Sequence, residues 1–449
     1  MSKKVVSLIL SILMVISSVP IFSVSAFALE KNKEFNYSIK NDECTITKYT
    51  GTSDTVTIPT KINGIKVSDI SSDAFIDSNI AEFKTEKDNN TYYSFNGVLY
   101  KRDRINEYTL VAYPNIKSDE KYYVSPMCTK IQSYAFEGTK YLKYLDCSDS
   151  IITKIGAYAF YNSSIEDISL FENKNDTLDY LEIGDYAFAK SQLKGYKFTD
   201  VSTSVGKYAF SDCKNFKSVT FPTSENHEIS LNNGCFDGAP LSPIVTVASV
   251  SSISGNIFGD NGNIAEIKLN SDFYAGTDFD YFNSLKNLKS FSVTDDFLIN
   301  KYNKPRGGFF VKDNCLYSQS ERSRTYYRTL CNYPKAKSDT EYAVYSSADT
   351  ENYGVNITFA KKSFAGNKNI KNISGNNISL IDEKAFYDCS GLTNADFNDS
   401  RVTVNKSAFE NSNLTNFTAN TVKDYPSSYR NTPYNEKRLS NAEWIDDIQ

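Results

Sequence analysis

The side chains that most often carry out chemistry are few and scattered in this sequence. The chain has 449 residues but a single histidine, His227, and most nucleophile activation and general-base catalysis needs an imidazole at a chosen place. His227 stands in the polar stretch 224–228, which predicts a solvated loop. The acidic pairs at 295–296 and 446–447, and Glu86 near Asp88, have no partner carboxylate at a defined spacing. We therefore expect these acids on the solvated surface and no catalytic residue.

The elements that must position any site repeat along the chain. A small residue followed by Phe, most often as Tyr-Ala-Phe, recurs mostly at intervals of about 23 residues. An apolar residue stands five positions before nearly every Phe, and a small or short polar residue stands three positions after it. The Phe residues of this element are Phe75, Phe136, Phe160, Phe188, Phe210, Phe236, Phe258, Phe282, Phe364, Phe386 and Phe409. We interpret Tyr-Ala-Phe as a core element whose Phe residues stack into a column.

A short alternating pattern follows each Phe. Two apolar positions flank one polar residue, as in Ile-Ser-Leu at 168–170 and Ile-Lys-Leu at 267–269. This period of two predicts a short strand with an exposed middle residue. A unit with one such strand cannot bury its apolar side alone, so successive copies must stack and share a core. The sequence therefore predicts a β-rich solenoid, and Lys197 and Lys268 are candidate contact residues on its exposed strand face.

Two longer intervals between Phe residues hold a matched insertion, at about 92–125 and 309–346. Each insertion, called a cassette below, has two β-rich runs around a charged tip, which predicts a hairpin. Cations beside aromatic rings are suited to contact acidic glycans or partner proteins, and the alternative is a tip that only serves solubility. The candidate contact residues are Lys101, Arg102 and Arg104 in the first cassette and Arg322, Arg324, Tyr326, Tyr327 and Arg328 in the second.

The chain has eight cysteines, which in an exported protein suggest disulfides. No C-x-x-C spacing typical of zinc ligands is present, so we expect no metal and no cofactor. Cys213 and Cys389 occupy the position three after Phe, where other copies carry Ser, Thr or Asn. This position favours buried free thiols at both sites.

Cys315 and Cys331 form a special case, because they replace a pair of valines in the first cassette. If Tyr317 pairs with Thr329 across the second hairpin, the two cysteines also lie opposite one another. Hypothesis: Cys315 and Cys331 form a disulfide, the alternative being two buried thiols in place of the valine pair. Peptide mass spectrometry without reduction that found both thiols free would exclude the bond.

The N-terminus has the features of an export signal. Lys3 and Lys4 precede a long apolar run, and Ala-Phe-Ala at 26–28 is a typical cleavage site. We predict a signal peptide of residues 1–28, after which Leu29 is the first residue. No later apolar stretch has the length of a membrane span, so we expect a secreted or cell-surface protein without a stable span.

The charge balance excludes one large class of partners. The chain has 49 Lys and Arg residues against 54 Asp and Glu residues, a formal net charge of -5. Loss of the two lysines of the signal peptide would bring the charge to -7. No broad basic field is available for phosphate backbones, so we expect no nucleic-acid partner.

The repeat unit resembles that of a known family. Ile-Gly-Ala-Tyr-Ala-Phe at 155–160 and Val-Gly-Lys-Tyr-Ala-Phe-Ser-Asp-Cys at 205–213 are similar to I-G-x-x-A-F-x-x-C, the start of the BspA-like leucine-rich repeat. The resemblance extends over roughly residues 45–419 and implies a leucine-rich-repeat solenoid with inserted hairpins. We expect a β-rich N-terminal segment at 29–65, the solenoid at 66–420 and a C-terminal cap or tail at 421–449.

The same resemblance implies a function outside the cell. Proteins of this family are described mostly as surface proteins that adhere to host proteins or partner cells, without shared catalytic residues. We therefore expect non-catalytic binding to an extracellular protein or glycan. Two alternatives stay open: a secreted hydrolase of polymers, which would need two close acids in a deep pocket, and a structural component of a secreted assembly.

Overall fold

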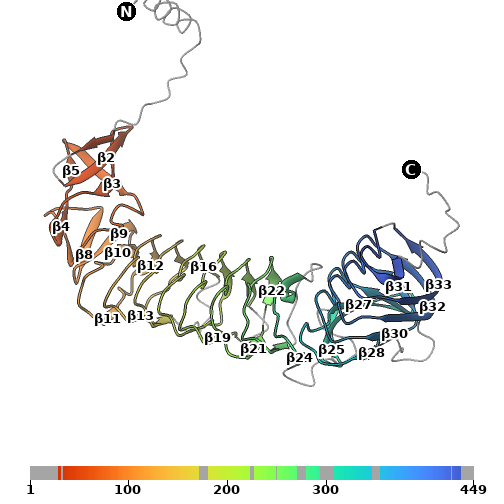
Figure 1. The fold of residues 1–449 in the computed structure, drawn as a ribbon. Coiled ribbons are helices and arrows are strands. Elements are labelled where there is room, and N and C mark those ends of the chain that lie inside the picture. The colour runs from red at the N-terminus through yellow and green to blue at the C-terminus, as the bar shows by residue number, and fades with distance from the viewer. Residues whose placement is uncertain are drawn as a thin grey trace, which may run out of the picture.

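The structure is a computed structural model that describes residues 29–31, 34–170, 180–222, 227–248, 250–269, 280–293, 308–345, 354–425 and 427–435. Its strands follow one another along a curved solenoid, with β2 near one end and β33 at the other (Figure 1). The predicted signal peptide, residues 1–28, lies outside the described residues.

A five-stranded sheet forms the N-terminal end. Its order is β1 (Leu29–Lys31), β2 (Phe35–Lys40), β3 (Glu43–Tyr49), β6 (Ile65–Ile70) and β5 (Lys61–Ile62). β3 and β6 run parallel, and the other neighbours run antiparallel. A parallel pair, β4 (Thr55–Ile58) and β7 (Glu82–Thr85), follows it.

The first array, residues 121–293, has two rows of short parallel strands. The inner row is β12 (Cys128–Ile131), β14 (Lys154–Ile155), β16 (Tyr180–Ile183), β18 (Ser202–Val205), β20 (Ile229–Leu231) and β22 (Val250–Ile253). The outer row is β11 (Lys121–Tyr123), β13 (Tyr144–Cys147), β15 (Asp167–Leu170), β17 (Gly195–Lys197), β19 (Ser218–Thr220), β21 (Ile244–Val247), β23 (Glu266–Leu269) and β24 (Ser290–Val293), with the 3-10 helix η2 (Asp280–Phe282) before β24. Figure 1 shows β12, β16 and β22 on the concave side of the solenoid and β13, β19 and β21 on the convex side.

Each cassette is a three-stranded antiparallel unit. The first contains β8 (Tyr92–Phe95), β9 (Val98–Arg104) and β10 (Glu107–Ala112), and the second contains β25 (Phe309–Lys312), β26 (Cys315–Arg322) and β27 (Thr325–Asn332). β10 then pairs parallel with β12, and β27 pairs parallel with β29, so each cassette joins the inner row that follows it.

The second array, residues 354–435, repeats the arrangement of the first. Its strands are β29 (Gly354–Phe359), β30 (Asn372–Ser374), β31 (Ile378–Ile381), β32 (Asn394–Val404) and β33 (Asn416–Asp424), preceded by β28 (Glu341–Ala343). β32 is long enough to pair with β30 through its first part and with β31 through its last.

A column of stacked aromatic rings forms the core of both arrays. The Phe136 and Phe160 ring centroids are 4.7 Å apart, and those of Phe160 and Phe188 are 4.8 Å apart with planes within 2°. The Phe column predicted from the repeat is therefore present, except that Phe75 is only partly buried and packs edge-on against Phe83 at 4.8 Å. Offset stacking between neighbouring rings adds to the hydrophobic burial of each side chain.

Tyrosines terminate the Phe column. Tyr113 of the first cassette stacks on Phe136 at 5.2 Å, and Tyr333 of the second stacks on Phe364 at 4.6 Å. Tyr429 continues the column beyond the last Phe of the second array and is completely buried. The arrays thus begin on a cassette ring, and the second ends on a tyrosine.

Each cassette lies between two hydrophobic cores and packs one face of its strands against each. Successive residues of its strands face opposite sides, as the pleat of a strand requires. The residues facing the preceding core are Leu99 and Val111 in the first cassette and Leu316 and Cys331 in the second. The residues facing the following core are Val98, Tyr100 and Leu110 in the first and Cys315, Tyr317 and Leu330 in the second.

The structure confirms the predicted solenoid but adds a strand to each repeat. The sequence predicted one strand after each Phe, whereas the apolar residue five positions before it ends a second strand of the inner row, as Ile155 ends β14. Ile155 pairs with Ile131 on one side and with Ile183 on the other. The inner strands span only two to four residues in this region, too short for their alternation to be read from sequence.

Candidate binding surfaces

The first hairpin tip is charged, but one of its cations is already paired. Lys101 Nζ lies 2.8 Å from Asp69 Oδ1 of the N-terminal sheet. Arg102 is exposed with its guanidinium 5.5 Å from the Tyr93 ring centroid, and Arg104 is exposed at the end of β9. Arg102 and Arg104 therefore remain the contact candidates of this tip.

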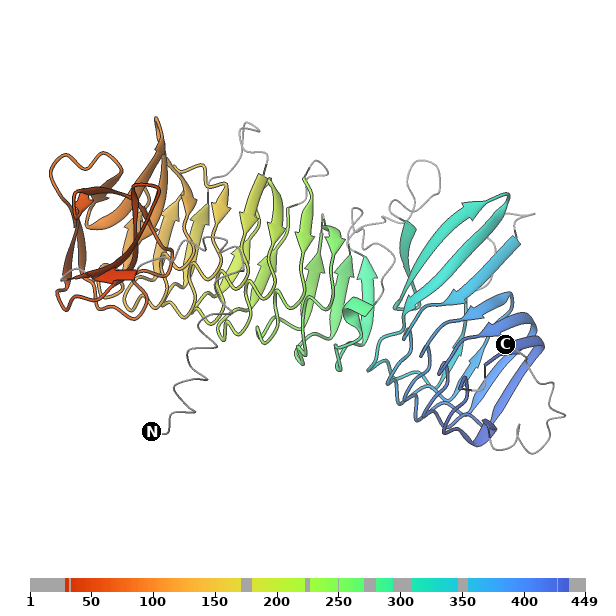
Figure 2. The ribbon, with the colours of Figure 1, turned by 90° about the horizontal axis from the view of Figure 1, so that it is seen from above.

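The second hairpin is longer and ends in a two-residue turn. Ser323 and Arg324 both have positive φ angles, 50° and 58°, which is the type I′ geometry favoured by the twist of hairpin strands. Arg322, Arg324 and Tyr327 are exposed, and Tyr327 keeps 44% of its accessible surface. Figure 2 shows the hairpin of β26 and β27, in teal, as two long strands, and β27 pairs with β29 as far as Thr325, next to the turn.

Arg328 is not part of this exposed tip, contrary to the sequence-based expectation. It is 1% exposed, its Nε donates to Gln319 Oε1 at 2.5 Å, and its guanidinium lies 4.2 Å from the Tyr345 ring centroid. Side chains alternate along β27, so Arg328 faces inward where Tyr327 faces outward. Tyr326, also expected at the tip, is only partly exposed and contacts Arg328 at 5.5 Å. Their position indicates a role in packing.

The pairing register of the second hairpin differs by one residue from the expected one. Tyr317 pairs with Leu330, and Leu316 pairs with Asn332, so that Cys331 is the extra residue of a β-bulge. Cys315 and Cys331 consequently contact different hydrophobic cores, and the structure leaves both thiols free and buried. The expected register was wrong from the turn onward, where Arg322 pairs with Thr325, and the bulge at Cys331 shifts the pairing by one further residue.

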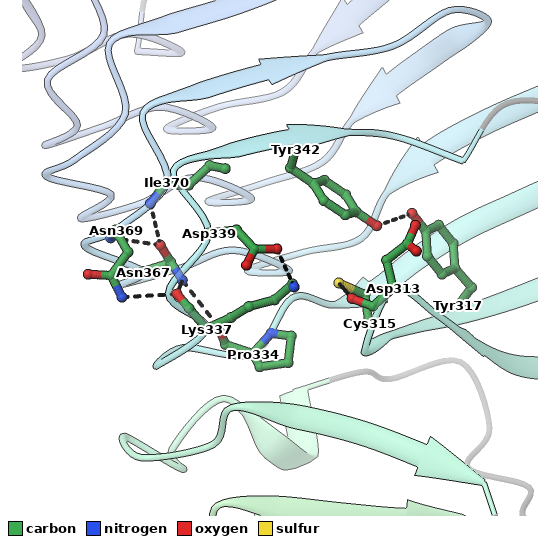
Figure 3. Close-up of polar contacts among 10 residues, drawn as sticks. All are labelled: Asp313, Cys315, Tyr317, Pro334, Lys337, Asp339, Tyr342, Asn367, Asn369 and Ile370. Carbon is green, nitrogen blue, oxygen red and sulfur yellow. Dashed lines mark hydrogen bonds and ion pairs between the residues drawn. The ribbon is translucent and has the colours of Figure 1, made fainter.

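The second cassette also holds a polar corner behind the hairpin (Figure 3). Lys337, with 8% of its side chain exposed, pairs with Asp339, and Asn367 Nδ2 donates to the carbonyl of Pro334 at 3.1 Å. Asn367 Oδ1 accepts from the backbone N–H of Ile370 at 2.9 Å. These bonds satisfy polar groups of the turn, as buried polar groups require.

The thiol and phenols beside this corner do not form a reactive centre. Burial raises the pKa of Cys315 to about 12, so its thiol stays protonated and is a weak nucleophile. The Tyr317 and Tyr342 hydroxyls hydrogen-bond to each other at 2.6 Å. The equivalent bond in the first cassette joins Tyr100 and Tyr122 at 2.9 Å, which indicates a structural feature of both cassettes.

The remaining candidates for chemistry are dispersed. His227 is partly exposed just before β20, and the Glu86 carboxylate accepts hydrogen bonds from Thr60 N–H and Oγ1 at 2.7 and 2.8 Å. Residues 295–296 and 446–447 lie outside the described part of the chain. In the part that is described, no group of three or more His, Cys, Asp and Glu side chains is placed to hold a metal ion.

Lys197 and Lys268 lie on the outer row, as the strand pattern predicted. Lys197 is exposed on β17, and Lys268 is partly exposed on β23. The structure does not bring either of them to a hairpin tip. Cys213 and Cys389 are free and buried, as predicted, and their thiols donate to the carbonyls of Phe188 and Phe364 at 3.0 and 3.1 Å.

A row of stacked tyrosines on the turns of the first array was missed. Ala159 and Phe160 of Tyr-Ala-Phe are buried, as expected for core, whereas Tyr158 is partly exposed. We call Tyr134, Tyr158, Tyr186 and Tyr208 the tyrosine edge. Their successive ring centroids are 5.1, 4.9 and 5.1 Å apart, and their planes are within 17° of parallel. The signal was available in the sequence, because Tyr recurs two positions before four successive Phe residues.

The fold places the chain among solenoid repeat proteins, in which each coil contacts mainly its neighbours. The family model of the BspA type leucine rich repeat region matches six copies, over residues 104–180, 181–303 and 356–440. These ranges cover more than half of the chain, so the protein belongs to the BspA-type leucine-rich-repeat family. A search of curated proteins found no significant match.

Several solved structures are similar in arrangement. The pneumococcal vaccine antigen PcpA is 16% identical, with 87% of this chain and 78% of that chain covered and a TM-score of 0.37. A leucine-rich cell surface protein from Faecalibacterium prausnitzii is 18% identical, with 87% and 94% covered and a TM-score of 0.38. A leucine-rich repeat protein from Bacteroides ovatus is 14% identical, with 88% and 90% covered and a TM-score of 0.40.

Proposed function

We propose that the protein is exported and works outside the cytoplasm as a non-catalytic binding protein that recognises protein or glycan surfaces. Its membership of the BspA-type leucine-rich-repeat family supports a surface role. One of the similar structures is named a cell surface protein and another a vaccine antigen. In the part of the chain that the structure describes, no helix has the length and hydrophobicity needed to cross a membrane.

The observation that carries the proposal is the exposed tip of the second hairpin. Arg322 and Arg324 are exposed at the turn between two eight-residue strands, and Tyr327 is exposed two residues into β27, which pairs with β29 as far as Thr325. Arg328 beneath them is held by Gln319 and an aromatic ring, which fixes the base of the hairpin. A rigid support lowers the entropy lost when such a tip binds a partner.

Binding arrays test the proposal. The protein from residue 29 to 449 is applied to arrays of extracellular proteins and glycans at low and at physiological salt. We expect a salt-sensitive ligand whose binding is lost in the double variant Arg322→Ala, Arg324→Ala. Arg102→Ala with Arg104→Ala removes the same charge from the other hairpin and is the matched control.

Two outcomes contradict the proposal as stated. Arrays without any ligand would oppose a binding function. Equal loss of binding in the Arg322 and Arg102 variant pairs would show that net charge, and not the second tip, drives association.

A further inference from the structure

The tyrosine edge is held in a backbone conformation that bulky side chains rarely adopt. Tyr134, Tyr158, Tyr186 and Tyr208 have φ angles of 61°, 57°, 56° and 56°. Residues with a large side chain avoid this left-handed region, because the Cβ atom approaches the neighbouring carbonyl oxygen. Four successive turns therefore keep a residue type that their own conformation disfavours.

The second array shows that the fold does not need these tyrosines. The same turn position there is taken by Lys362, Lys384 and Ser407, with φ angles of 57°, 58° and 57°. Buried Phe residues still stack two positions later, with the Phe386 and Phe409 centroids 4.8 Å apart. The same turn and the same column thus form without an aromatic residue at this position.

The tyrosine edge presents a regular row of polar groups to solvent. Both ring faces of Tyr158 and Tyr186 are occupied by neighbouring rings, so these partly exposed tyrosines offer their ring edges and phenols. The Tyr208 hydroxyl accepts a hydrogen bond from Asn233 Nδ2 at 3.3 Å. Tyr161 packs edge-on against Tyr158 at 5.4 Å and accepts a hydrogen bond from Lys190 at 2.8 Å. A phenol hydroxyl both donates and accepts, which suits a ligand rich in hydroxyl groups.

The charges beside the edge balance one another. Asp185 Oδ1 accepts from the backbone N–H of Lys207 at 2.7 Å, and Lys214 pairs with Asp212 at 2.6 Å. With Lys190 and Glu137, the flank carries three cations (Lys190, Lys207 and Lys214) and three anions (Glu137, Asp185 and Asp212) over four coils, so it offers no strong field of either sign. This balance favours a neutral ligand over an acidic or basic one.

The spacing of the edge discriminates between kinds of linear ligand. Adjacent tyrosines recur at 4.9 to 5.1 Å. Same-facing side chains of an extended peptide recur at about 6.6–6.8 Å, and a polyproline II helix turns once per about 9.3 Å. Neither matches one contact per coil. An extended chain of β-1,4-linked hexopyranoses advances by one sugar at nearly the same step as the solenoid. Alternate sugars are turned over, so successive phenols meet hydroxyls from alternating edges of the sugar rings.

We propose that the tyrosine edge binds a neutral, extended β-1,4-linked glycan, with successive sugar hydroxyls bonded to successive phenols. This inference rests on the proposed function and names its ligand class and surface.

The test uses oligosaccharides of defined linkage and the protein from residue 29 to 449. Cellohexaose and chitohexaose are titrated calorimetrically, with the β-1,3-linked laminarihexaose as the probe of mismatched spacing. We expect at least one of the two β-1,4-linked hexamers to bind, and shorter chains to bind more weakly. Which hexamer binds distinguishes a cellulose-type from a chitin-type glycan. The β-1,3-linked hexamer should bind at least about tenfold more weakly.

A matched pair of variants assigns the surface. Asparagine tolerates positive φ, so Tyr158→Asn with Tyr186→Asn removes two phenols and keeps the turn. Loss of two ligand hydrogen bonds should weaken binding about tenfold or more. Lys362→Asn with Lys384→Asn introduces asparagine at the equivalent turns of the second array without removing a phenol, and should leave binding unchanged. Circular dichroism confirms that each variant is folded.

Three results would overturn the inference: no binding of either β-1,4-linked hexamer at millimolar concentration, equal affinity for the β-1,3-linked hexamer, or unchanged affinity in the Tyr158 and Tyr186 variant. If array ligands still bind through Arg322 and Arg324, the proposed function stands and only the tyrosine edge is excluded. If the arrays are blank as well, both proposals fail.

Discussion

Replacement of Phe188 by alanine should strongly destabilise the first array. The side chain is completely buried, and its ring stacks on Phe160 at 4.8 Å and on Phe210 at 5.2 Å, with planes within 4°. Truncation of a buried Phe costs about 3–5 kcal/mol, including the cavity that remains. Two stacked pairs, each contributing about 0.5–1.5 kcal/mol, place Phe188 in the upper half of that range.

The neighbouring rings cannot move to fill this cavity. Phe160 N–H donates to the carbonyl of Ala187 at 2.6 Å, and Phe188 N–H donates to the carbonyl of Ala209 at 2.7 Å, so the backbone holds each ring at its own coil. We therefore expect a loss of about 4 kcal/mol or more in the free energy of unfolding. Urea unfolding followed by circular dichroism measures it, with hydrogen exchange to show that the loss is centred on the first array.

Tyr186→Asn is the matched control for Phe188→Ala, two positions away in the same turn. Its ring is only partly buried, and the relief of the disfavoured left-handed conformation by asparagine offsets the loss of its stacking on Tyr158 and Tyr208, so we expect a change of at most about 1 kcal/mol. A loss below about 1.5 kcal/mol for Phe188→Ala, or one no larger than that of the control, would refute a continuous aromatic core.

Three further predictions follow from individual contacts. Arg328→Ala should destabilise the second cassette by about 2 kcal/mol or more in thermal unfolding, since it removes a desolvated cation–π contact and the partner of Gln319, whereas Arg322→Ala should stay within about 0.5 kcal/mol. Lys101→Ala should cost less than about 1 kcal/mol in urea unfolding, because its ion pair is partly exposed. Burial raises the pKa of Cys315 to about 12 from 9.0, so the unfolded chain loses this proton first. The stabilisation that the protonated Cys315 thiol gives the folded state is complete below pH 9 and disappears as the pH rises toward 12. The free energy of unfolding should therefore fall less steeply with alkaline pH in Cys315→Val. An unchanged pH dependence would contradict the raised pKa of Cys315.

The fold was readable from the sequence because each coil repeats the same packing. The Phe residues and the alternating triplets mark two positions of every coil, and both are present in the structure as the aromatic column and the outer row. The repeat pattern did not predict that Tyr113, Tyr333 and Tyr429 belong to the aromatic column, because a tyrosine replaces the Phe there and the surrounding residues change. Their stacking on Phe136, Phe364 and Phe409 depends on where the chain re-enters the column.

The candidate surfaces were only partly readable. Arg322, Arg324 and Tyr327 were assigned to an exposed tip and are exposed, but the inward side of β27 carries Arg328. A list of residue types shows neither where a hairpin turns nor which side of its strands faces the core. Tyr158 was counted as core, because its neighbour Phe160 is core and exposure within a three-residue element depends on the turn.

The most direct test of the account is to measure binding and turnover on the same ligand. The protein from residue 29 to 449 is incubated overnight with a glycan or protein that it binds, and the mass of the recovered ligand is then measured by mass spectrometry. The account predicts saturable binding and a ligand of unchanged mass. A cleaved or otherwise modified ligand, produced by wild type but not by a heat-inactivated sample, would contradict non-catalytic recognition.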